Sequence, residues 1–135
     1  MRRTVVDIEG LGHSQPIPLA VAMGNILVTG SVNGRDRESG ALPPALGDEV
    51  DRAFDNLALV LERAGTSWAG LLKLDVLVRT AQVREHVNTA WLARFPSADD
   101  RPVRHVTTTE LPADFNIQLL ALALIPSDQP EKDER

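Results

Sequence analysis

The 135-residue chain contains no cysteine and no tyrosine. The absence of cysteine excludes disulfides, zinc–thiolate sites and cysteine nucleophiles. Its apolar runs are short, and none approaches the roughly 20 residues that span a bilayer. The two arginines near the N-terminus are followed by Asp7 rather than by a long apolar stretch. We therefore expect no signal peptide and no membrane association. These absences favour a cytoplasmic protein.

Positive charge and aromatic side chains are also scarce. The chain has 14 Lys and Arg against 19 Asp and Glu, for a net charge of −5, and its only aromatic residues besides histidine are three Phe and two Trp. An acidic chain with few stacking side chains argues against nucleic-acid binding. The histidines, His13, His86 and His105, lack metal-ligand spacing, so we expect no metal. Residues 30–34 are glycine-rich but lack the ending of a phosphate loop.

What is present suits one folded domain. Hydrophobic residues make up 43% of the chain and charged residues 24%, the balance of a globular protein with a core. We assign residues 1–126 to this domain. Residues 127–135 are almost entirely polar and charged, which predicts a disordered tail.

The hydrophobic pattern predicts the element order β-β-β-α-β-α-β-β, an α+β fold with two helical crossovers. Asp48 is the expected cap of the first helix, and Gly65 its expected end. The inward faces are expected to hold Val50, Phe54, Leu57 and Leu61 in the first helix and Val83, Val87, Ala90 and Trp91 in the second. The strands are predicted at residues 3–8, 19–23, 25–29, 72–78, 103–110 and 115–125, and the helices at residues 48–65 and from about residue 80 to residue 95.

The last predicted strand is apolar on both faces over residues 119–125, so both faces need cover. Two helices lie on one face of a sheet of this size. The other face then needs a partner, and a second copy of the same chain is the simplest one. The alternative is a single-chain core with an uneven sheet.

Three polar residues lie on these elements. Arg104 lies in the middle of a predicted strand among apolar and β-branched neighbours, where an arginine is either paired or faces a ligand. The pattern alone favours a structural ion pair, although a guanidinium also suits a ligand carboxylate. Asn88 alone is typical of a solvated helix position, and Gln118 of a polar position on an edge strand.

Several short motifs, taken in order, resemble one known family. Together they extend from about residue 14 to residue 124 and resemble the YjgF/RidA proteins, the reactive-intermediate deaminases once called L-PSP endoribonucleases. The motifs are Gly-Asn-Ile-Leu-Val-Thr-Gly-Ser at 24–31, Phe-Asp-Asn-Leu at 54–57, Ala-Gly at 64–65, Leu-Lys-Leu-Asp-Val at 72–76, Val-Asn-Thr-Ala-Trp at 87–91, Phe-Pro at 95–96, Arg-Pro-Val-Arg at 101–104, Leu-Pro at 111–112 and Ile-Gln-Leu at 117–119.

The resemblance implies a chorismate-mutase-like single domain with two helices on one face of the sheet. It also implies homotrimers whose sheets pack into a central barrel, with sites in clefts between subunits. In that family an arginine binds the carboxylate of a small acid, and no metal or organic cofactor is used. The residues implied at the cleft are Arg104 as the carboxylate anchor, Asn88 beside it, and Thr29, Gly30 and Ser31 as a source of a hydroxyl and backbone amides.

Three positions depart from the family pattern. Gln118 stands where the family has a glutamate, and an amide cannot act as a base. Ile17 replaces a tyrosine of the N-terminal loop, and Val106 replaces a cysteine. The expected catalytic positions are therefore Arg104 and Gln118, with Ile17 in the binding cleft.

The first functional hypothesis is a trimer that binds a small carboxylic or imino acid and hydrolyses 2-imino acids such as 2-iminopropanoate or 2-iminobutanoate to 2-keto acids and ammonia. The second is a non-catalytic trimer that binds a small metabolite in the same cleft. Ribonuclease activity is the least favoured, because charge and aromatic content both argue against RNA.

Overall fold

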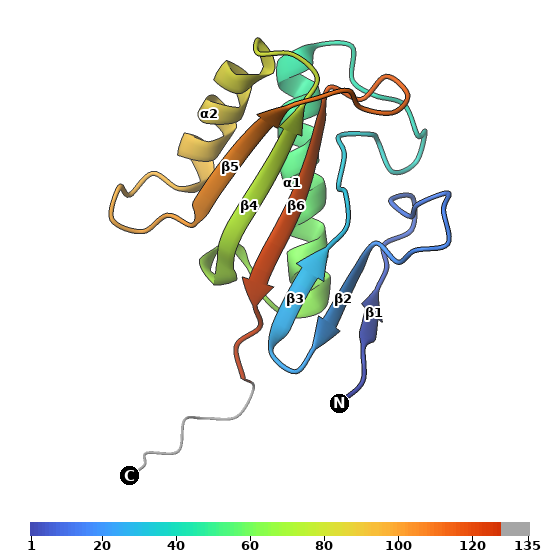
Figure 1. The fold of residues 1–135 in the computed structure, drawn as a ribbon, viewed down its shortest axis with the longest axis vertical. Helices are drawn as coiled ribbons and strands as arrows, with labels where there is room; N and C mark the ends of the chain where they lie inside the picture. The colour runs from blue at the N-terminus through green and yellow to red at the C-terminus, as the bar shows by residue number, and fades with distance from the viewer. Residues whose placement is uncertain (128–135) are drawn as a thin grey trace.

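The computed structural model describes residues 1–127 and contains six strands and two α-helices in the predicted order (Figure 1). The expected tail therefore lies, apart from Ser127, outside the described residues. The elements are β1 (Thr4–Val6), β2 (Ala20–Met23), β3 (Ile26–Thr29), α1 (Leu46–Ala64), a short 3₁₀ helix (Trp68–Gly70), β4 (Leu71–Val78), α2 (Val83–Arg94), β5 (Val103–Thr108) and β6 (Ile117–Leu124).

The six strands form one sheet in the order β1-β2-β3-β6-β4-β5. The β4–β5 pair is parallel, since α2 connects the two strands, and the other pairs are antiparallel. The last strand of the chain thus lies between β3 and β4 in the interior of the sheet (Figure 1). The interpretation of Gln118 as an edge-strand residue is wrong, because β6 has a neighbour on each side.

Both helices cover the same face of the sheet (Figure 1). The apolar positions predicted to face inward do so, and the buried ones are Val50, Phe54, Leu57 and Leu61 of α1 and Val83, Val87, Ala90 and Trp91 of α2. Within residues 1–127, this packing leaves the opposite face of the sheet without a helix (Figure 1).

The structure corrects several element boundaries. Helix α1 begins at Leu46, with Ala45 at the N-cap and no side-chain capping bond, so the predicted cap at Asp48 is wrong. Asp48 lies in the first turn, where its charge still favours the positive end of the helix. Helix α1 ends as predicted at Gly65, whose φ of 95° suits glycine. Helix α2 begins at Val83, three residues later than predicted, because a turn precedes it.

The uncovered side of the sheet carries apolar side chains. Along β6, alternate residues are buried under the helices, while Leu120 and Leu122 are partly exposed and Leu124 is 40% exposed. In the neighbouring strand β3, Val28 pairs with Leu122 and Ile26 pairs with Leu124. Val28 is 41% exposed and Ile26 is 47% exposed. We call this apolar surface the open face. It confirms that the helices cover one side of β6 only.

Two buried polar side chains of α1 hold the segment that follows β3 and the segment that precedes β6. Glu49 is 2% exposed, and its carboxylate accepts hydrogen bonds from the backbone N–H (2.9 Å) and the side-chain amide (2.8 Å) of Asn116. Asn56 is also 2% exposed and donates to the carbonyl oxygens of Asn33 (2.9 Å) and Arg35 (3.0 Å). Helix α1 therefore fixes both the start of β6 and the loop that follows β3.

Replacing Glu49 with Ala should destabilise the fold. The change removes two charge-assisted hydrogen bonds and leaves the backbone N–H of partly buried Asn116 without its acceptor, which should lower the free energy of unfolding by about 1.5–3 kcal/mol. Urea denaturation measures this loss. Glu62→Ala, at an exposed position of the same helix, is the matched control and should change stability little. Equal effects of the two changes would contradict a structural role for the buried carboxylate.

Candidate functional site

A pocket of about 730 Å³ lies beside β6, on the same side of the sheet as Leu120. Its volume lies within the range of small-molecule sites. It brings together Ile17, Gly30, Ser31 and Gln118, four of the residues expected at the site. Its other walls come from Gly12, His13, Ser14, Gln15, Asn33, Arg35, Pro112, Ala113, Phe115 and Leu120. We call it the Gln118 pocket.

One wall of the pocket is a turn that Arg79 holds in place. The Nε of Arg79 donates to the carbonyl oxygen of Phe115 at 2.9 Å, and its Nη2 donates to those of Leu111 (2.9 Å) and Ala113 (2.8 Å). Ala113 adopts a φ of 51°, a left-handed conformation that is uncommon for alanine. A guanidinium that binds three carbonyl groups makes this turn a fixed part of the pocket.

The polar groups expected at this site differ in what they contact. The side chain of Gln118 is 9% exposed and makes no hydrogen bond to any other residue of the described chain, and the Ser31 hydroxyl makes none there either. Thr29 does not line the pocket, and its Oγ1 accepts a hydrogen bond from the backbone N–H of Ala121 at 3.0 Å. The amide of Gln118 and the hydroxyl of Ser31 are therefore the groups available to a ligand.

Arg104 and Asn88 lie together elsewhere. In the β4–β5 ladder Arg104 pairs with Leu74, which is fully buried under the helices, so the arginine side chain also lies on the helix-covered side. Its Nη2 donates to Asn88 Oδ1 at 2.8 Å, and its Cζ lies 4.9 Å from the centre of the Trp91 ring. Burial, and to a lesser degree the Arg84 cation, lowers the pKa of Arg104. Its positive charge is thus less stable than in water.

Arg104 has no ion pair with any residue between 1 and 127, so the interpretation as a structural ion pair is wrong. Gln118 pairs with Leu77 on the side of the sheet opposite Leu74. Arg104 and Gln118 of one chain therefore lie on opposite faces of the sheet. The structure brings the expected site residues other than Thr29 together in two groups, one in the Gln118 pocket and one at β5 and α2.

Two basic residues of the Gln118 pocket, Arg35 and His13, were not predicted from the sequence. Arg35 donates from Nη2 to the carbonyl oxygen of Gly12 at 2.6 Å, and no acidic residue between 1 and 127 lines the pocket. His13 lies against Gly30, so that a Cβ added to this glycine would lie 3.1 Å from His13 Nε2. Both residues occupy polar loops, and only contacts between distant segments bring them together.

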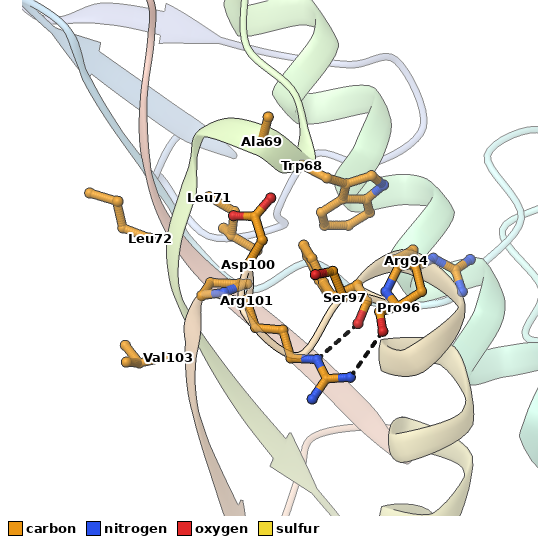
Figure 2. Close-up of a pocket in the computed structure, with 12 residues that line it drawn as sticks. Trp68, Ala69, Leu71, Leu72, Arg94, Pro96, Ser97, Asp100, Arg101 and Val103 are labelled. Carbon is orange, nitrogen blue, oxygen red and sulfur yellow. Dashed lines mark hydrogen bonds between the residues drawn. The ribbon is translucent and has the colours of Figure 1, made fainter.

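A second pocket, of about 570 Å³, lies at the other end of the sheet (Figure 2). Figure 2 shows the guanidinium of Arg101 turned toward the backbone, where it donates to the carbonyl oxygens of Phe95 (2.9 Å) and Pro96 (3.4 Å). The other arginine in its lining, Arg94, forms ion pairs with aspartates of α1. Its cations are engaged and it holds none of the expected residues, so the Gln118 pocket is the better candidate site.

Within residues 1–127, no group of three histidine or acidic side chains is placed to hold a metal ion. Neither α-helix in that range has the length and apolar character needed to cross a membrane. The fold and the pocket define a class: a small α+β domain with a pocket lined by polar and basic groups.

The family model described as Endoribonuclease L-PSP matches residues 14–125. The chain belongs to this family, the YjgF/RidA family, and the resemblance found in its motifs is confirmed. No curated protein sequence matches the chain.

Solved structures share the fold over nearly the whole chain. A putative endoribonuclease from Thermotoga maritima is 24% identical, with a TM-score of 0.83 over 94% of this chain and 100% of that one. RidA from the Antarctic bacterium Psychrobacter sp. is 18% identical, with a TM-score of 0.82 over 90% and 99%. Escherichia coli TdcF with bound serine is also 18% identical, with a TM-score of 0.83 over 91% and 99%.

Replacing Gly30 with Ala should displace His13 without unfolding the protein. The added Cβ would lie 3.1 Å from His13 Nε2, so the imidazole must move by a few tenths of an ångström. We expect altered NMR shifts of the His13 ring and a change in unfolding free energy below about 1 kcal/mol. Gly12→Ala, where a Cβ meets no atom within 4 Å, is the control. An unchanged His13 spectrum in Gly30→Ala would contradict this packing.

Proposed function

We propose that this protein binds a small carboxylic or imino acid in a cleft between subunits of a homotrimer and hydrolyses 2-imino acids slowly. The observation that carries the proposal is the Gln118 pocket, where the described lining holds an amide, a hydroxyl and two basic side chains but no acidic residue. Family membership supports it, as does the serine bound to TdcF, which carries a carboxylate. The absence of an apolar spanning helix in the described residues agrees with a cytoplasmic location.

The open face supports assembly from copies of this chain. Leu120 lines the Gln118 pocket, and the apolar side chains of β3 and β6 continue from it across the sheet. A second copy packed on this surface would remove the apolar side chains from water and narrow the pocket. The cleft also needs a neighbour if Arg104 is to contribute, because Arg104 of the same chain lies on the other face of the sheet. Arg104 is at β5, an edge strand, where it can reach an adjacent subunit.

In the proposed reaction, water adds to the carbon of the C=N bond and ammonia leaves. The 2-imino acid and one water become the 2-keto acid and one ammonia, without a redox step or cofactor. Arg104 of the neighbouring subunit would hold the carboxylate, and the Ser31 hydroxyl would orient the substrate. The side-chain oxygen of Gln118 can accept a hydrogen bond from the attacking water, but it cannot take the proton. The site thus positions its reactants without the base that a glutamate would supply.

Replacing Leu122 with Lys should dissociate the assembly. The substitution places a charge in the middle of the open face, where it would be buried without a partner in the trimer. Light scattering should show the mass of three chains for the wild-type protein and a smaller particle for Leu122→Lys. The control is Leu92→Lys on α2, since Leu92 is 52% exposed and lies outside the open face. A monodisperse wild-type monomer at micromolar concentration would overturn the trimer.

Replacing Gln118 with Glu should raise the rate of 2-iminopropanoate hydrolysis by about tenfold or more, because a positioned base contributes about 10²–10⁴ in rate. Ammonia release from enzymatically generated imine measures the rate. The double variant with Ile17→Tyr tests whether pocket shape limits the gain. Arg104→Ala should remove the activity of Gln118→Glu while leaving the thermal unfolding curve nearly unchanged.

A non-catalytic role is the second candidate, and the amide of Gln118 is the observation that favours it. Absence of activity in the wild type, Gln118→Glu and the double variant, together with measurable binding of pyruvate, would favour the binding protein over the enzyme. Robust wild-type turnover would show that another group replaces the family glutamate. Salt-sensitive RNA binding would instead support the ribonuclease name of the family.

A further inference from the structure

The buried side-chain atoms that lack a hydrogen-bond partner in residues 1–127 all belong to basic residues: His13 Nε2, Arg35 Nε and Arg104 Nη1. Buried polar atoms are nearly always paired, and an unpaired donor on a cation is costly to keep. Two of these residues line the Gln118 pocket, and the third is the expected carboxylate anchor. The residues that carry these unpaired atoms therefore lie in two places, on opposite faces of one sheet.

Arg35 is held in place but not neutralised. The carbonyl oxygen of Arg35 accepts a hydrogen bond from buried Asn56, its N–H donates to Asn33 Oδ1 at 3.1 Å, and its Nη2 binds the Gly12 carbonyl oxygen. These contacts fix the backbone and one end of the guanidinium. They leave Nε without a partner and supply no negative charge, so the guanidinium stays able to bind an anion.

The nearest acid in sequence, Asp36, does not serve as the counterion. It accepts hydrogen bonds from the backbone N–H groups of Ser39 and Glu38, each at 2.9 Å, and pairs with Arg52 at 2.9 Å. These contacts, with the Ser39 bond contributing most, lower the pKa of Asp36 to about 2. Asp36 lines a different pocket, so the charge of Arg35 faces the Gln118 pocket unopposed.

We propose that the ligand of this protein carries two acidic groups, and that Arg35 binds the second one in the Gln118 pocket. This inference rests on the proposed function, in which Arg104 of a neighbouring subunit binds the first. His13, on the pocket wall next to Gly12, adds a second basic group near Arg35. The substrate class is then a 2-imino or 2-oxo dicarboxylic acid rather than a monocarboxylic one.

The lining of the pocket agrees with a longer ligand. Ile17 and Leu120 supply apolar wall beside the polar groups. A dicarboxylic acid presents apolar methylene groups between two charged ends, which matches a pocket with basic and apolar lining. Two charged contacts at fixed positions also select against ligands that have only one acidic end, because one guanidinium then stays unpaired.

The test compares two ligands of equal carbon number, 2-oxoglutarate and 2-oxopentanoate, which differ in the second carboxylate. Isothermal titration of the wild-type protein should give an affinity for 2-oxoglutarate that is higher by about tenfold or more, the scale of one charged contact in a partly exposed site. Arg35→Gln should remove this difference. Arg37→Gln removes the same charge from an exposed position outside the pocket and should preserve it.

Equal affinities for the two acids in the wild type, or a difference that persists in Arg35→Gln, would overturn the inference and leave the proposed function standing. Failure of both acids to bind would overturn the proposed function itself. If Arg35→Gln does not fold, Arg35→Lys keeps the charge without the planar fork, and a reduced but measurable preference for 2-oxoglutarate is expected. The wild-type comparison alone already decides whether a second acidic group is recognised.

Discussion

The candidate site depends on two buried polar side chains of one helix. Glu49 and Asn56 are seven residues apart in α1, two helical turns, and therefore lie on nearly the same side of the helix. Glu49 binds Asn116, just before β6, and Asn56 binds the carbonyl groups of the loop that carries Arg35. One rigid helix thus sets the distance between Gln118 and Arg35. A Cβ at Gly34 would meet the Glu49 carbonyl oxygen, so this approach of loop to helix also requires a glycine.

The central position of β6 gives the protein its two different surfaces. Alternation along the strand places one set of side chains under the helices and the other set, including Gln118 and Leu122, on the opposite side. The same alternation in β5 places Arg104 under α2, where Trp91 and Asn88 contact it. Because side chains alternate between the two faces along each strand, Arg104 and Gln118 lie on opposite faces of the sheet. The family resemblance nevertheless assigns both residues to one site. This separation is a geometric reason for the proposed site to draw on two subunits.

Periodicity predicted the element types, their order and the buried faces of both helices, because these follow from local sequence. The boundaries were less predictable. Asp48 has the chemistry of a cap, yet α1 extends further back, to Leu46. The position of Arg104 in a strand also predicted that it needs a partner, but the partners are an amide and an indole rather than a carboxylate. His13 and Arg35 escaped prediction because contacts such as that of Arg35 with Gly12, 23 residues away, form only in the folded chain.

The charge distribution described for the Gln118 pocket has a kinetic consequence. The chain as a whole carries a net charge of −5, while the pocket lining within residues 1–127 has basic residues and no acid. An anion approaching from solution first meets a repulsive field, and the attraction of the pocket acts only within about one Debye length, roughly 8 Å at physiological ionic strength. Added salt screens the distant repulsion more than it weakens the close contact. Entry of an anionic ligand should therefore be fastest at intermediate ionic strength, the opposite of the steep decline with salt that a basic, steering surface produces.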